Sequence, residues 1–223
     1  MKKILYKSWH ILKNYLKLNI LKDKKLIALQ SYYSDYPYQS VLYDFKLNED
    51  SIVFDVGGYI GEYSERIYSM YNSNIYIFEL FPKFHFLIKN KFQLNKKIKV
   101  FDFGLSNKDQ EIFIENNGVG TSVYGKQRKG IKTNVKCASN FILDNQIKQI
   151  DLMKLNVEGA EFDILHNLIT KDIVKNIKFI LIQFHEIDNL SVKKRKEIQY
   201  ELSKTHNKLF DYYFIWECWE IKS

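Results

Sequence analysis

SIVFDVGGYIG, residues 51–61, is the stretch that decides the fold of this chain. Its first half is rich in β-branched and aromatic apolar residues, which is typical of a buried strand. Gly57, Gly58 and Gly61 then form a tight turn, and a helical pattern follows over residues 62–70. Glycines suit a turn whose backbone must approach a ligand closely or adopt positive φ. This stretch therefore predicts the first strand, turn and helix of an α/β domain that binds a nucleotide-like ligand.

The spacing of the turn narrows the choice of ligand. The dinucleotide pattern G-x-G-x-x-G is not met, because Tyr59 occupies the position of its second glycine. The pattern acid-x-Gly-x-x-x-Gly, from Asp55 to Gly61, resembles the first motif of methyltransferases that use S-adenosylmethionine (SAM). For this motif alone, an ordinary glycine turn of an α/β protein stays open as an alternative.

A second acidic residue supports a nucleotide-like cofactor. Residues 75–78 read as the next strand, which ends at Glu79 and is followed by Leu80 and Phe81. In a doubly wound sheet this carboxylate lies at the carboxyl end of the strand beside the first, where it can meet ribose hydroxyls. Two acids at neighbouring strand ends favour a cofactor site, and a solvated strand end is the alternative for Glu79.

Length and composition restrict the class of protein. A chain of 223 residues suits one α/β domain. Cys137 and Cys218 have no metal-ligand spacing and form no disulfide framework, which favours the cytoplasm. The formal charge of +8 permits a nucleic acid, an anionic membrane or a phosphorylated substrate, and selects none of them.

The first 25 residues predict a basic amphipathic helix, with apolar residues at helical spacing and lysines between them. The lysines interrupt the apolar run, so neither a signal peptide nor a transmembrane helix is expected. Packing on the domain and peripheral contact with the inner membrane face are both open. Residues 1–48 are predicted to hold this helix and a tyrosine-rich lead-in, and residues 49–223 the catalytic domain.

The rest of the chain continues the alternation of strands and helices. Further strands are predicted at 98–103, 111–115, 151–157 and 177–184, with a last strand at 210–219; helices are predicted at 83–94, 139–146, 162–169 and 192–205. Between them, the polar loop 116–130 holds Ser122, Lys126 and Arg128, which are candidate contacts to a substrate that carries phosphate.

Five motifs resemble, in the same order, the FkbM-type SAM-dependent methyltransferases. They are DVGGYIGEYS (55–64), FELFP (78–82), KLNVEGAEFDIL (154–165), IQFH (182–185), and TH (205–206) with WECW (216–219). The resemblance implies a Rossmann-like class I methyltransferase fold with a mostly parallel, doubly wound sheet. It also implies methyl transfer to an oxygen, commonly a hydroxyl of a sugar or polyketide.

The same resemblance implies a cofactor site. Its residues would be Asp55, Gly57 and Gly61 at the methionine end, Glu79 at the ribose, Gly104 and Leu105 at the adenine, with Gly58, Tyr59 and Phe81 completing it. Two departures stand out. Asn156 occupies a position where many relatives have Asp, and the segment after His185 looks too short for a helix and two more strands, so the last strand is expected to be absent or rearranged.

Methyl transfer to a hydroxyl requires in-line alignment of the acceptor and removal of its proton. His185, at the end of a strand, is the expected general base, with Glu158 orienting it or the acceptor hydroxyl, and Asn156 beside them. A structural histidine is the alternative. A divalent ion held by Glu158, Glu161 and His185 is open but not favoured.

These observations favour methyl transfer to a sugar or nucleotide-linked sugar in surface polysaccharide biosynthesis. An RNA ribose O-methyltransferase and a non-catalytic nucleotide-binding module are the alternatives. Methylation of a base amine is disfavoured, because Val157 and Glu158 follow Asn156 where such enzymes place two prolines and an aromatic residue.

Overall fold

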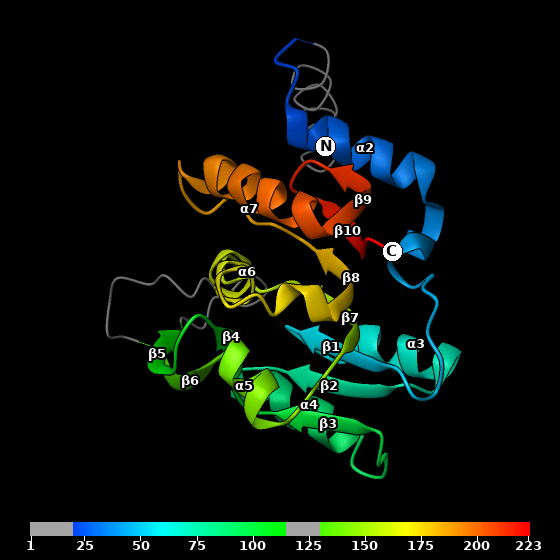
Figure 1. The fold of residues 1–223 in the computed structure, drawn as a ribbon, viewed down its shortest axis with the longest axis vertical. Coiled ribbons are helices and arrows are strands. Elements are labelled where there is room, and N and C mark those ends of the chain that lie inside the picture. The colour runs from blue at the N-terminus through cyan, green and yellow to red at the C-terminus, as the bar shows by residue number, and fades with distance from the viewer. Residues whose placement is uncertain (1–19, 115–129) are drawn as a thin grey trace, which may run out of the picture.

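The computed structural model describes residues 20–114 and 130–223. Its main feature is a seven-stranded sheet in the order β3-β2-β1-β7-β8-β10-β9 (Figure 1). The strands are β1 (Ile52–Val56), β2 (Asn74–Phe78), β3 (Ile98–Phe101), β7 (Ile150–Leu155), β8 (Ile177–Ile182), β9 (His206–Tyr212) and β10 (Trp216–Ile221). The first five are parallel, and β10 runs antiparallel to β8 and β9. This arrangement confirms the predicted Rossmann-like, mostly parallel sheet.

Helices cover both faces of the sheet, because side chains of a buried strand alternate between its two faces. The helices are α2 (Lys24–Asp35), α3 (Glu62–Tyr71), α4 (Pro82–Lys91), α5 (Ala138–Asp144), α6 (Glu161–Thr170) and α7 (Ser191–Thr205), with short 3-10 turns η1 (Pro37–Leu42) and η2 (Val174–Asn176). Val53 of β1 packs in one apolar cluster with Ile67 of α3 and Ile88 of α4. Phe54, the next residue, joins the cluster on the opposite face.

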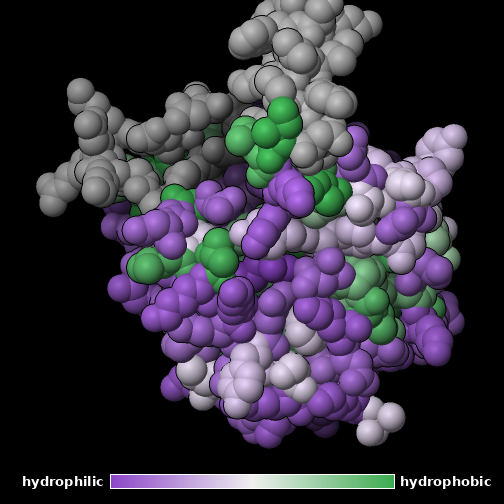
Figure 2. Space-filling model, turned by 90° about the horizontal axis from the view of Figure 1, so that it is seen from above, coloured by the Kyte–Doolittle hydropathy of each residue, from purple (hydrophilic) through white to green (hydrophobic). Residues whose placement is uncertain are grey.

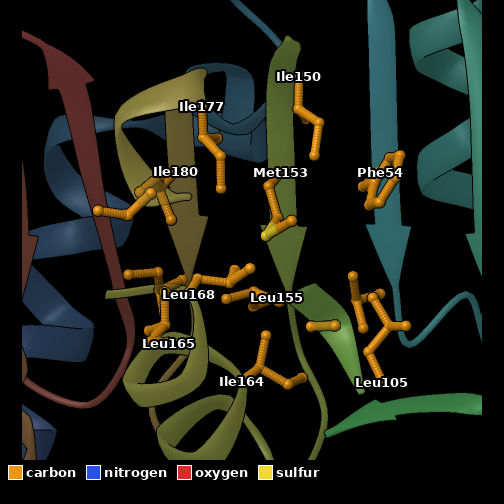
Figure 3. Close-up of a cluster of buried hydrophobic side chains, with 14 of the residues drawn as sticks. Phe54, Leu105, Ile150, Met153, Leu155, Ile164, Leu165, Leu168, Ile177 and Ile180 are labelled. Carbon is orange, nitrogen blue, oxygen red and sulfur yellow. The ribbon is translucent and has the colours of Figure 1, made fainter. Parts of the chain in front are cut away.

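That second cluster is drawn in Figure 3, where Met153 and Ile180 from the sheet face Ile164 and Leu168 of α6. None of these four side chains is measurably exposed. The packing anchors α6, and with it the turn that precedes this helix. The face of the molecule in Figure 2 is instead mostly hydrophilic, with hydrophobic residues in small separate groups, as expected of a surface in water.

A smaller sheet of three strands follows β3. It has the order β4-β6-β5, formed by β4 (Gly104–Ser106), β5 (Gln110–Ile114) and β6 (Ile131–Cys137). β6 was not among the strands predicted from the sequence. Thr133 of β6 donates a hydrogen bond from its hydroxyl to the carbonyl of Leu80 at 2.9 Å, which ties the small sheet to the segment after β2.

The C-terminal segment corrects one expectation. It was expected to be too short for a helix and two strands, with one last strand over residues 210–219, but α7, β9 and β10 are all present. They fit because β9 begins at His206, directly after α7, and a short turn joins it to β10. The aromatic run through this turn contains no glycine or proline, which hid the break between two strands.

The lead-in packs on the far edge of the sheet. The rings of Tyr32 in α2 and Tyr212 in β9 lie 5.3 Å apart, and the Tyr212 hydroxyl donates to Asp35 at 2.7 Å. Most of the basic helix expected over residues 1–25 lies outside the described residues, and residues 20–23 of that range are not helical. The boundary at residue 48 stays a prediction. No helix within the two described ranges has both the length and the apolar character needed to cross a membrane.

Candidate active site

A cavity of about 360 Å³ lies at the carboxyl ends of β1, β2 and β7. The strand order reverses between β1 and β7, which is where open α/β sheets bind ligands. Of the residues predicted for the site, those that line the cavity are Gly57, Tyr59, Glu79, Phe81, Gly104, Leu105, Asn156 and Glu158. Others that the sequence analysis did not name as site residues complete the wall, among them Leu80, Phe84, Ser106, Gln110, Ile112 and Val135.

The first glycine of the turn is required by close packing. Gly57 has φ of +87°, and a Cβ atom there would lie 2.1 Å from the carbonyl oxygen of Asn156. Gly58 and Gly61 are not part of the cavity wall. A Cβ at Gly58 would lie 2.3 Å from Ile77 of β2, so this glycine lets the turn pack down onto the sheet.

Glu79 joins the turn after β1 to the segment after β2. One carboxylate oxygen accepts the backbone N–H of Tyr59 and the other that of Phe81, both at 2.8 Å. Burial raises the pKa of Glu79, and these two hydrogen bonds, together with the positive charge of Lys154, oppose that rise. The carboxylate is thus held in place at the cavity wall.

Asp55 lies beneath the turn and outside the cavity wall. Its side chain is fully buried, accepts the Ser64 hydroxyl at 2.6 Å and pairs with the ammonium of Lys154 at 2.9 Å. The same ammonium donates to the carbonyl oxygen of Gly57 at 2.8 Å. Lys154 was not among the residues predicted for the site, although a lysine inside the otherwise apolar run before Asn156 indicates a buried charge that needs a partner.

His185, Glu158 and Glu161 come together at the edge of the cavity. Oε1 of Glu161 accepts the backbone N–H of His185 at 2.7 Å and lies 3.2 Å from its Nδ1, while Nε2 lies 3.5 Å from Oε1 of Glu158. Glu158 lines the cavity and has a left-handed φ of +50°, whereas His185 and Glu161 do not line it. Glu158 therefore stands between the imidazole and the cavity.

The same contacts do not form the metal site that the sequence analysis left open. Within residues 20–114 and 130–223, no group of three or more histidine, cysteine or acidic side chains is placed to hold a metal ion. The two oxygens of Glu161 already accept backbone N–H groups from His185 and Gly159. The substrate candidates Ser122, Lys126 and Arg128 lie outside the described residues.

The family model described as methyltransferase FkbM domain matches residues 55–214. The fold is similar to a protein described as a "putative rRNA-methylase" from Clostridium thermocellum, with 13% identity, coverage of 82% of this chain and 93% of that chain, and a TM-score of 0.52. A fibrillarin pre-rRNA processing protein from Methanococcus jannaschii has 14% identity, coverage of 82% and 73%, and a TM-score of 0.48.

At 13% identity, the similarity to the Clostridium thermocellum structure indicates a shared fold alone. A search of curated proteins finds no match to this sequence. The chemistry of the cavity wall is compatible with SAM, because the wall combines a buried carboxylate, apolar side chains from Leu80, Phe81 and Leu105, and a glycine turn that tolerates no Cβ. The chain belongs to the FkbM methyltransferase domain family, and it is a SAM-dependent methyltransferase with a Rossmann-like class I fold.

Proposed function

We propose that this enzyme transfers the methyl group to a hydroxyl oxygen of a sugar or nucleotide-linked sugar, in the cytoplasmic steps of surface polysaccharide biosynthesis. The observation that carries the proposal is the contact of His185 with Glu158 at the edge of the cofactor cavity. Such a pair suits removal of a proton from a weakly acidic hydroxyl. The sugar acceptor rests on the resemblance of the sequence motifs.

The cavity wall supplies groups for each part of the cofactor. Glu79 would accept hydrogen bonds from the ribose hydroxyls, Leu105 and Phe81 would flank the adenine, and the turn at Gly57 would hold the methionine end. SAM supplies an electrophilic methyl group on a sulfonium. The role of the protein is then to align an acceptor and accept its proton.

Glu158 and His185 would share the work on the acceptor. Glu158 lines the cavity, so its carboxylate would accept the hydrogen bond of the acceptor hydroxyl and orient it. Glu161 is positioned to accept from Nδ1, which leaves the lone pair of Nε2 to take the proton. Because Glu158 stands between the cavity and the imidazole, the hydroxyl proton would pass along this hydrogen bond to the carboxylate of Glu158 and from there to Nε2 of His185, and the charge that forms there lies between two carboxylates.

The experiment is a transfer assay with purified protein and SAM that carries a labelled methyl group. Nucleotide sugars, free sugars and RNA are offered separately, and products are identified by mass spectrometry. The proposal expects one added methyl group on a sugar hydroxyl and loss of that product with Glu158→Gln. Transfer to RNA with none to any sugar would replace the proposal with an RNA ribose O-methyltransferase.

A further inference from the structure

Lys154 occupies an unusual position for a lysine, near the carboxyl end of β7, a strand buried on both faces. In the sheet it lies beside Asp55 of β1, and its side chain is only 7% exposed. A buried ammonium is costly unless it is paired and hydrogen-bonded. The positions of its partners suggest a role for it.

Those partners lie directly under the glycine turn. Besides the contacts to Asp55 and to the carbonyl of Gly57, the ammonium lies 5.4 Å from the centre of the Tyr63 ring in the first turn of α3. The other oxygen of Asp55 holds Ser64, also in that first turn. Lys154 thus connects β7 to both ends of the turn that forms one wall of the cavity.

The N–H groups of the turn are held from the opposite side. The carbonyl of Phe78, at the end of β2, accepts from Gly57 at 2.9 Å and from Gly58 at 3.3 Å, and Glu79 accepts from Tyr59. The turn is therefore fixed between two strands, with β2 accepting from its N–H groups and Lys154 of β7 donating to its first carbonyl.

We propose that Lys154 is a positioning residue for the cofactor, which fixes the peptide group of Gly57 and, through Asp55, the start of α3. It is not part of the cavity wall, so it acts through the turn. Its charge has a second effect, because it opposes the rise in the pKa of Glu79 that burial causes. Lys154 thereby helps to keep the carboxylate at the cavity wall ionised.

The test is the binding of S-adenosylhomocysteine, measured by calorimetry without any acceptor, to Lys154→Met and to the wild-type protein. We expect affinity to fall about tenfold or more, because a charged hydrogen bond to the turn is lost. As the pH is lowered, the affinity of Lys154→Met should begin to fall at a higher pH than that of the wild type. The reason is that Glu79 loses the nearby cation that opposes the rise in its pKa. Lys178→Met in the neighbouring strand β8 is the matched control, and its affinity should stay at the wild-type value.

A second variant covers the case in which Lys154→Met does not fold. Asp55→Asn combined with Lys154→Met removes both buried charges, and it should fold and still bind weakly. The inference would be overturned if a folded variant bound S-adenosylhomocysteine with the affinity and pH dependence of the wild type. It would also be overturned if neither variant folded, because the pair of Lys154 and Asp55 would then be required for folding. The inference rests on the proposed cofactor site, so the affinity of Glu79→Gln is measured in the same experiment. Wild-type affinity in Glu79→Gln would reject the proposed site itself rather than the role of Lys154.

Discussion

The carboxylate of Glu161 holds His185 twice, through the backbone N–H at 2.7 Å and at Nδ1 of the ring at 3.2 Å. Glu161 has no exposed surface, so the orientation of the imidazole is set by a side chain inside the protein. The tautomer with the proton on Nδ1 satisfies this contact and directs Nε2 towards Glu158.

Replacing His185 by alanine should abolish most turnover while cofactor binding is kept. Loss of a general base typically lowers the rate by about 10²–10⁴-fold, and His185 does not line the cofactor cavity. The measurements are kcat with the identified acceptor and the affinity for S-adenosylhomocysteine. His166→Ala, an exposed histidine on α6, is the control and should behave as wild type. Unchanged turnover in His185→Ala would exclude it as the base.

The two glutamates of the cluster should respond differently to replacement by glutamine. Glu161→Gln leaves a buried donor without an acceptor, so the free energy of unfolding should fall by about 1–3 kcal/mol, together with turnover. Glu158 is 39% exposed, so Glu158→Gln should change stability by less than about 0.5 kcal/mol and still lose turnover. Denaturant unfolding and kcat of both variants check this, and equal losses of stability would contradict it.

Binding of the cofactor product should depend on pH through Glu79. Ribose hydroxyls donate to the ionised carboxylate, so affinity should fall as pH falls through the pKa of this group. Because burial raises that pKa, the fall should begin at a higher pH than for an ordinary glutamate. Titrations from about pH 8 to about pH 5 measure it. In Glu79→Gln the affinity should be lower, and it should not change with pH over the range where Glu79 titrates in the wild type.

Arg195 should be essential for the C-terminal hairpin. Its buried guanidinium pairs with Asp211 of β9 and Glu217 of β10, so Arg195→Met leaves the buried carboxylate of Glu217 without its cation, at a cost of about 3–5 kcal/mol. Lys193→Met, which removes an exposed pair on the same helix, should change stability by less than about 0.5 kcal/mol.

The stability loss in Arg195→Met should itself depend on pH. Burial raises the pKa of Glu217, and Arg195 opposes that rise. Without the arginine, the folded variant binds a proton at Glu217 more tightly than the unfolded chain does, so acidification stabilises it. The melting temperatures of Arg195→Met and the wild type should therefore differ less at about pH 5 than at about pH 8. A constant difference would show that Glu217 is not the group left unpaired.

Local patterns were sufficient for much of the fold. The strand, glycine turn and helix at residues 51–70 and the position of Glu79 at the end of β2 followed from residue periodicity and turn chemistry alone. The hairpin of β9 and β10 did not, because its turn lacks glycine and proline. Strand β6 was missed as well, in a region where the polar loop dominated the pattern.

Most strands and helices, and the acidic residues that end the strands, followed from the sequence alone, because periodicity and turn residues act over a few neighbouring positions. Only the tertiary structure decided that Lys154 meets Asp55, 99 residues away, and that Glu161 holds His185, 24 residues away. Such pairs depend on which strands become neighbours and in which register. Strand order and register are determined when the whole sheet buries its two apolar faces, so they cannot be read from any single segment.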